Sequence, residues 1–272
     1  MDKMDAGCMN LNCLHVPYDQ VQRDLDRYMD YGGSQKTRYQ HRQRIDNIKN
    51  ILDRLGIASN DRILDVGCGS GIYLTLMAER SKNVVGVELS KEGIERSQVI
   101  FDEMGLKDRI HILRGDVMDL PFHGGSFDFV LCTEVLEHLP DPSKGTLEIQ
   151  RVLKKGGTAL ISMPNLISIF WLFNRIKAEA GRISGVTTDI DPHMKYPFWK
   201  IEGILRKAGF DVKAVRGTYM IPSDLLFRLF PRNKNIAKLV YALGRIEWKI
   251  NIKPLNAFFF VLATKRDKME GK

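Results

Sequence analysis

An apolar segment that runs through an aspartate into three alternate glycines constrains the fold more than any other feature. It reads Ile63-Leu64-Asp65-Val66-Gly67-Cys68-Gly69-Ser70-Gly71. Such a turn lets the backbone approach a ligand closely, because side chains at the glycine positions would collide with the ligand or require unfavourable dihedrals. The segment therefore predicts a strand, a tight turn and a helix that together hold a nucleotide-like ligand.

Short apolar segments bounded by turn residues alternate with helical patterns over much of the chain. Their separations suit helical crossovers between parallel strands. We therefore expect an α/β fold with a doubly wound, mainly parallel sheet and helices on both faces. Strands are expected at Arg62 to Val66, Val84 to Glu88, Ile110 to Arg114, Phe127 to Cys132, Thr158 to Met163, Phe210 to Val215 and Ala257 to Thr264.

The helices are expected between these strands and before the first of them. Apolar residues at helical spacing predict a helix from Arg38 to Leu55 that Gly56 closes. A later helix, Pro197 to Ala208, should end at Gly209. Further helices should begin near Gly71, Lys91 and Ser143, with Ser90 and either Asp141 or Ser143 as N-caps.

The length of 272 residues and the 44% apolar composition suit one domain with a large core. We expect this domain over residues 41–272, after an N-terminal segment over residues 1–40. Two connections, residues 164–197 and 219–256, are much longer than the usual connection of about 4–6 residues. They are expected to be insertions that form a helical cap.

The charge of the chain is unevenly distributed. Residues 198–256 hold 12 Lys and Arg against 4 Asp and Glu, which equals the whole net charge of +8. An anionic partner should therefore meet the C-terminal third, unless this surface is simply solvated. The apolar stretch from Leu166 to Phe173 is interpreted as a hydrophobic lid, a segment at a membrane interface or a buried cap helix.

The sequence predicts a cytoplasmic protein. Its start lacks the apolar stretch of a secretory signal, and no apolar run approaches the roughly 20 residues that span a bilayer. The four cysteines show no CxxC spacing and no nearby histidine cluster, so we expect neither disulfides nor structural zinc. Peripheral contact with a membrane is left open.

Two further acids end expected strands. Glu88 ends the second strand and Asp116 follows the third, and ligands of open α/β sheets bind at these ends. The glycine spacing is GxGxG, and Ile72 stands where a dinucleotide fingerprint has its third glycine. Asp65 could accept hydrogen bonds from an ammonium group, which a dinucleotide lacks. A nicotinamide-dependent oxidoreductase is therefore the weaker alternative.

Together these motifs resemble the class I S-adenosylmethionine-dependent methyltransferases, in the branch of quinone-biosynthesis and small-molecule enzymes. The resemblance rests on Asp65 to Gly71, Glu88, Gly115-Asp116-Val117, Phe127 to Val130 and Glu134-Val135-Leu136-Glu137-His138-Leu139. It covers about residues 45–165 and 200–215. It implies a seven-stranded sheet with an antiparallel last strand, S-adenosylmethionine as the cofactor, and an N-terminal segment that closes over the substrate.

The resemblance also implies roles for single residues. Asp65, Gly67, Gly69 and Gly71 would surround the methionine part of the cofactor, and Glu88 would hold its ribose. The adenine would lie against Leu89, Asp116, Val117 and Met118, and the sulfonium would face Thr133 and Glu134.

Methyl transfer is a displacement that needs in-line positioning and exclusion of water. A hydroxyl acceptor must also lose its proton to a base. The candidate bases are Glu134, His138 and His193. Glu134 and His138 are expected one helical turn apart on one face, and His193 lies in the first insertion. For each histidine, simple packing is the alternative.

The acceptor is expected to be a small or lipid-like molecule, with an anionic one left open, methylated at oxygen or carbon. Nucleic acid is not expected, because Cys132-Thr133-Glu134-Val135 stands where base-methylating enzymes carry an Asn-Pro-Pro-Tyr type of motif. No clustered metal ligands are evident, so no metal is predicted. A non-catalytic module that binds the cofactor remains an alternative, and the oligomeric state is not indicated.

Overall fold

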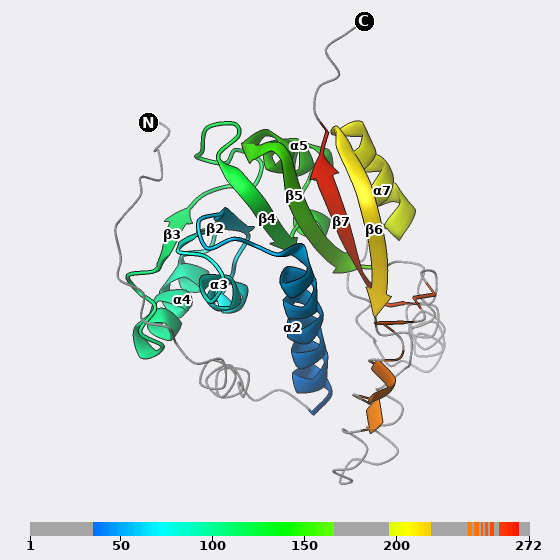
Figure 1. Ribbon diagram of the computed structural model, residues 1–272, viewed down its shortest axis with the longest axis horizontal. Coiled ribbons are helices and arrows are strands. Elements are labelled where there is room, and N and C mark those ends of the chain that lie inside the picture. Colours follow the sequence, from blue (N-terminus) through cyan, green and yellow to red (C-terminus); the bar gives the residue numbers. More distant parts are fainter. Residues whose placement is uncertain are drawn as a thin grey trace, which may run out of the picture.

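The computed structural model describes residues 35–165, 196–218 and 256–266, together with 239–240, 242–244, 246, 248–249 and 251–252; its side chains are described from residue 41 onward. A seven-stranded sheet runs through the molecule in the order β3-β2-β1-β4-β5-β7-β6 (Figure 1). Only β7 is antiparallel to its neighbours β5 and β6 among these strands. The strands are β1 (Arg62–Val66), β2 (Asn83–Glu88), β3 (Ile110–Arg114), β4 (Phe127–Thr133), β5 (Leu153–Pro164), β6 (Phe210–Thr218) and β7 (Phe258–Lys265).

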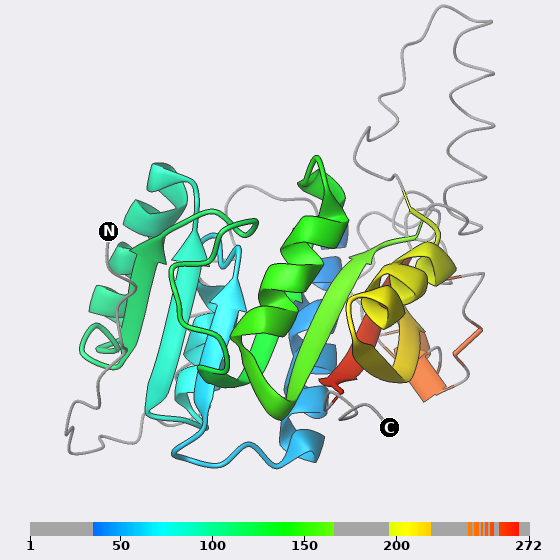
Figure 2. The ribbon, with the colours of Figure 1, turned by 90° about the horizontal axis from the view of Figure 1, so that it is seen from above.

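Helices cover both faces of this sheet (Figure 2). One apolar cluster joins the sheet to α2 (Gln35–Leu55), α3 (Ile72–Ala78) and α4 (Lys91–Glu103). A second cluster on the other face joins it to α5 (Pro142–Val152) and α7 (Phe198–Lys207). The predicted doubly wound α/β fold, with seven strands and an antiparallel last strand, is therefore confirmed.

The expected turn and cap residues have the conformations their sequence positions require. Gly71 precedes α3 with a φ of 76°, in the left-handed region that favours glycine. The Ser90 hydroxyl accepts the Gly93 amide at the start of α4. At α5 the cap is Asp141 rather than Ser143, because the Asp141 carboxylate accepts the amides of Ser143 and Lys144.

Strand β5 begins earlier than the predicted Thr158. Leu153 already pairs with Phe127, while Phe129 pairs with Thr158, so the residues between form an irregularity in the ladder. Gly156 turns the chain there with a φ of 71°. The residues between Leu153 and Thr158 are typical of a turn, which explains the late predicted start. Leu153 nevertheless belongs to the strand, because its side chain is buried in the core.

Sheet order indicates that a ligand should bind at the carboxyl ends of β1 and β4. The chain leaves β1 toward β2 and β3, then returns to the opposite side of β1 with β4. Helical connections therefore diverge at this point, and the carboxyl ends of β1 and β4 are open to a ligand. The residues predicted to bind a cofactor lie at these ends and at those of β2 and β3.

Both predicted cap insertions fall largely outside the described residues, as do most of the N-terminal segment and His193. The cap therefore stays a prediction. Within the described part of the chain, no helix combines the length and apolar character needed to cross a membrane.

Candidate functional site

Asp65 lies at the carboxyl end of β1 with no exposed surface. Neither of its carboxyl oxygens has a hydrogen-bond partner. Burial, reinforced by the nearby negative charge of Glu88, raises the pKa of Asp65 to about 8. A buried carboxyl group without a partner is costly unless a ligand supplies donors, so this position points to a ligand with hydrogen-bond donors.

The glycine turn lies between Asp65 and Glu88. The Glu88 carboxylate accepts the Gly69 amide through Oε2 and the Ser90 amide through Oε1, each at 2.8 Å. Gly69 has a φ of 53°, and a Cβ built on it would meet no atom within 4 Å. The turn is therefore fixed by Glu88, while the space beside Gly69 is open to a ligand.

The ends of β2 and β3 carry the residues predicted to border adenine. Asp116 accepts the Met118 amide through Oδ1 at 2.8 Å, and this turn holds the backbone of Val117 in place. Val117 itself is buried in the core. Leu89 is 60% exposed, so an apolar surface is available for a planar ring at this edge of the sheet.

The end of β4 differs from the prediction. Glu134 has a φ of 55°, in the left-handed region, and its amide donates to the Ser162 carbonyl at 2.9 Å. The helical turn that follows is the short 3-10 helix η1 (Leu136–His138), which starts only after Glu134. Glu134 and His138 therefore do not share a helical face, and that expectation was wrong. Thr133 is buried and His138 is exposed.

Arg44 was missed by the sequence analysis. It lies on α2, its side chain is 10% exposed, and its guanidinium forms an ion pair with Glu134. The same guanidinium lies 3.2 Å from His41 Nδ1 and 5.2 Å from the centre of the Phe258 ring. A buried cation from α2 thus meets the acid at the end of β4.

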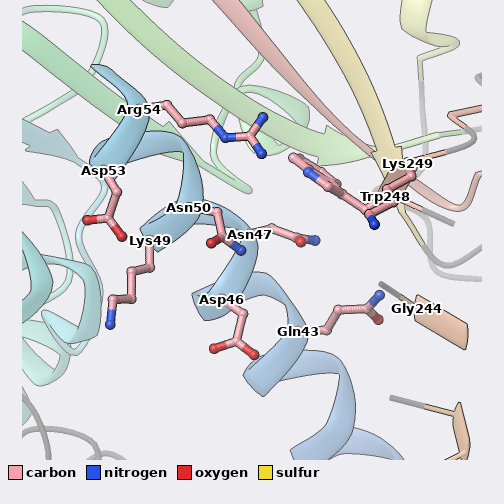
Figure 3. Close-up of a pocket in the computed structure, with 10 residues that line it drawn as sticks. All are labelled: Gln43, Asp46, Asn47, Lys49, Asn50, Asp53, Arg54, Gly244, Trp248 and Lys249. Carbon is pink, nitrogen blue, oxygen red and sulfur yellow. The ribbon is translucent and has the colours of Figure 1, made fainter. Parts of the chain in front are cut away.

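A separate pocket of about 500 Å³ lies between α2 and the residues Gly244, Trp248 and Lys249 (Figure 3). Its wall on α2 includes the amides of Gln43, Asn47 and Asn50, and Trp248 faces them. Gln43 is buried, and neither polar atom of its side chain has a partner. None of the residues predicted to bind the cofactor lines this pocket.

Comparison with known proteins agrees with this geometry. A methyltransferase domain model matches residues 64–161. A ubiquinone biosynthesis O-methyltransferase of Pseudomonas aeruginosa is 33% identical over 187 residues, which cover 66% of this chain and 76% of the relative. The chain belongs to the class I S-adenosylmethionine-dependent methyltransferases. The chain spans only about half the length of other relatives, such as the enzyme of the same name from Psychrobacter arcticus, which is 34% identical over 49% of its own length and 46% of this chain.

Solved structures share the fold of this methyltransferase. An S-adenosylmethionine-dependent methyltransferase from Aquifex aeolicus has a TM-score of 0.53 at 19% identity, covering 79% of this chain and 88% of its own. The phosphoethanolamine N-methyltransferase 2 of Haemonchus contortus, solved with S-adenosylmethionine, has a TM-score of 0.54 at 21% identity, covering 81% of this chain and 53% of its own. At these identities the likeness concerns the fold alone.

The residues at these strand ends fit S-adenosylmethionine. The cofactor carries an ammonium group, and the buried Asp65 oxygens need donors. Its ribose carries two hydroxyls, and the Glu88 carboxylate keeps acceptor capacity beyond the two amides it already accepts. The open space beside Gly69 allows the backbone approach that such a ligand requires.

The metal prediction is not tested by this structure. Within the described ranges, no group of three or more His, Cys, Asp and Glu side chains is placed to hold a metal ion.

Proposed function

We propose that the protein transfers the methyl group of S-adenosylmethionine to an oxygen of a small, lipid-like acceptor. The buried, unpartnered Asp65 beside the glycine turn carries this proposal. The names of the relatives, ubiquinone biosynthesis O-methyltransferases, support oxygen as the methylated atom and a quinone-related, lipid-like molecule as the acceptor class. Transfer to carbon is the alternative acceptor chemistry.

The bound cofactor supplies a methyl group activated by the sulfonium. The chain's own residues bind and orient the cofactor. Asp65 accepts hydrogen bonds from its ammonium group, and Glu88 accepts hydrogen bonds from its ribose hydroxyls. Methyl transfer also requires that the site exclude water and hold the acceptor oxygen in line with the methyl group. A base takes the hydroxyl proton. Glu134 is favoured over His138 because it directly follows β4, whereas His138 is exposed at the last position of η1.

Mass spectrometry tests this proposal. Lipid and small-molecule extracts, including quinone precursors, are incubated with the protein and with S-adenosylmethionine labelled in its methyl group. We expect a labelled phenol ether with the wild type and none with Asp65→Ala. If wild-type protein binds the cofactor but labels no extract, the non-catalytic binding module becomes the better account. Label on carbon or nitrogen would contradict O-methylation.

We also propose that residues 239–252 contact an anionic membrane. The described residues of 239–249 are helical, and the side chains of Leu239 and Ile246, seven positions apart, are 49% and 50% exposed. Residues at this spacing share a helical face. Lys249 is exposed nearby, and the surrounding third of the chain carries the excess positive charge. Exposed apolar and basic side chains together suit an anionic lipid surface.

Co-sedimentation with anionic and neutral vesicles at low and moderate salt tests the membrane contact. Binding should be restricted to anionic vesicles and should weaken with salt. Ile246→Glu should reduce it, whereas Leu147→Glu, at an exposed leucine of α5, should not. Equal binding to both vesicle types, or equal effects of the two variants, would contradict the proposal.

A further inference from the structure

Arg44 is a buried cation with a single charged partner among the described side chains, Glu134. Its other neighbours are the neutral ring of Phe258 and His41. Burial and the adjacent Arg44 lower the pKa of His41 to about 4, so His41 is uncharged at neutral pH. The charge of Arg44 is therefore balanced by Glu134, and its Nε has no hydrogen-bond partner.

Arg44 also lies close to the carboxyl group expected to bind the cofactor. Burial raises the pKa of Tyr73, the positive charge of Arg44 opposes this rise, and the negative charge of Asp65 adds to it. Tyr73 on α3 thus experiences both charges. The strand register supports this placement, because Asp65 of β1 pairs with Leu131 of β4, three residues before the Glu134 that forms the ion pair with Arg44.

The methionine end of S-adenosylmethionine carries an ammonium and a carboxylate on the same carbon. If Asp65 accepts the ammonium, the carboxylate must lie within a few bonds of it and requires a donor there. Arg44 presents a buried guanidinium at that end of the site. Two carboxylates, that of the cofactor and that of Glu134, then approach one cation.

The conformation of Glu134 shows that its place beside Arg44 is held against strain. A non-glycine residue rarely adopts the left-handed region, because its Cβ is crowded against the backbone there, and Glu134 has a φ of 55°. Its amide bond to Ser162 fixes the backbone, while the carboxylate, 36% exposed, is fixed by Arg44. Loss of the ion pair would leave the backbone in place and free the side chain.

We propose that Glu134 competes with the cofactor carboxylate for Arg44, so that cofactor binding releases Glu134 toward the acceptor. While Glu134 is paired with Arg44 it weakens cofactor binding. After the cofactor carboxylate has replaced it on Arg44, the Glu134 carboxylate is free to contact the acceptor. This inference rests on the proposed function and assigns its two substrates an order, with the cofactor first. The released carboxylate then accepts the proton of the acceptor hydroxyl as the new carbon–oxygen bond forms and the sulfonium leaves as a thioether.

Calorimetric titration with S-adenosylmethionine and with decarboxylated S-adenosylmethionine tests the competition without any acceptor. The ratio of the two affinities measures what the cofactor carboxylate contributes. Glu134→Gln should raise this ratio about tenfold, the order of one hydrogen bond to a charged group. Glu134→Gly should do the same and also removes the left-handed strain, so it keeps the test independent of folding. Glu95→Gln, which removes an exposed acid of α4, should leave the ratio unchanged.

A double-mutant cycle identifies Arg44 as the shared partner. Arg44→Gln should lower the ratio about tenfold, and adding Glu134→Gln to it should have no further effect on the ratio. An unchanged or lower ratio in Glu134→Gln and Glu134→Gly would overturn the competition, as would an effect that persists without Arg44. Failure of the wild-type protein to bind S-adenosylmethionine would instead overturn the proposed function.

Discussion

Asp65 lowers the stability of the folded protein at neutral pH and provides the carboxyl group expected to bind the ligand. Because its pKa is raised to about 8 in the folded protein, the native state holds a proton that the unfolded state loses above about pH 4. Stability is therefore lost as the pH rises from about 4 to 8, by up to about 1.4 kcal/mol per pH unit. The same buried carboxyl group is what a ligand ammonium requires.

Asp65→Asn should consequently stabilise the protein at neutral pH while abolishing cofactor binding. We expect a gain of about 1–3 kcal/mol in the free energy of unfolding at pH 7 and almost none at pH 4, measured by urea denaturation. Asp128→Asn is the matched control, because Asp128 accepts the Arg62 amide and pairs with Lys154 and should lose stability. Equal losses in both variants at pH 7 would refute the account of Asp65.

Cofactor binding should also release a proton from Asp65. An ammonium group beside the carboxyl group favours its ionised form, so binding at pH 7 should release about one proton. Calorimetry in buffers of different ionisation enthalpy measures this number, which should fall toward zero above about pH 9. In Glu88→Gln the number of protons released should fall to zero at a lower pH, because the negative charge of Glu88 contributes to the raised pKa of Asp65. A release of zero at pH 7 would contradict the prediction.

At the scale of helices and strands, two of the three glycines of the turn serve different purposes. Gly71 has a φ of 76°, and a Cβ on it would lie 2.5 Å from Phe101 Cζ. Gly69 is also left-handed, but its missing Cβ faces open space. Gly71 is therefore required by packing of the turn against α4, whereas we expect Gly69 to serve the approach of the ligand.

Substitutions at these glycines should separate stability from binding. Gly71→Ala should lose about 2–4 kcal/mol of unfolding free energy through backbone strain and overpacking. Gly69→Val should lose only about 1–2 kcal/mol, remain folded at 25 °C and no longer bind S-adenosylmethionine. Thermal denaturation followed by circular dichroism, with calorimetric titration, measures both effects. Unaltered cofactor affinity in folded Gly69→Val would mean that the ligand does not approach this turn.

Sequence patterns predicted the strands well because each is a short apolar run bounded by turn residues. They failed where a contact joins distant segments. Arg44 precedes Glu134 by ninety residues, so no local pattern indicates their ion pair. One signal was present: Arg44, Ile48 and Leu52 recur at intervals of four, which places a cation on the apolar face of α2. The left-handed Glu134 likewise had no signature, because non-glycine residues rarely adopt that conformation.

Over the whole molecule, the sheet and α2 bring together the groups that we propose to bind the cofactor. The carboxyl ends of β1, β2 and β4 supply acids, and α2 supplies the buried cation at the same end of the sheet. A ligand that bridges them binds the folded protein and has no equivalent site in the unfolded chain. Its affinity should therefore appear as global stability.

S-adenosylmethionine should raise the melting temperature of the whole domain. At a hundred times its dissociation constant it contributes about 2.7 kcal/mol, which corresponds to about 5–10 °C for a domain of this size. Differential scanning fluorimetry with S-adenosylmethionine, S-adenosylhomocysteine and NADH measures the effect. The first two should stabilise the wild type and neither should stabilise Asp65→Asn, because both carry the ammonium group that Asp65 accepts. NADH lacks that group and meets Ile72 where its fingerprint requires glycine, so an equal shift with NADH would contradict the assigned cofactor chemistry.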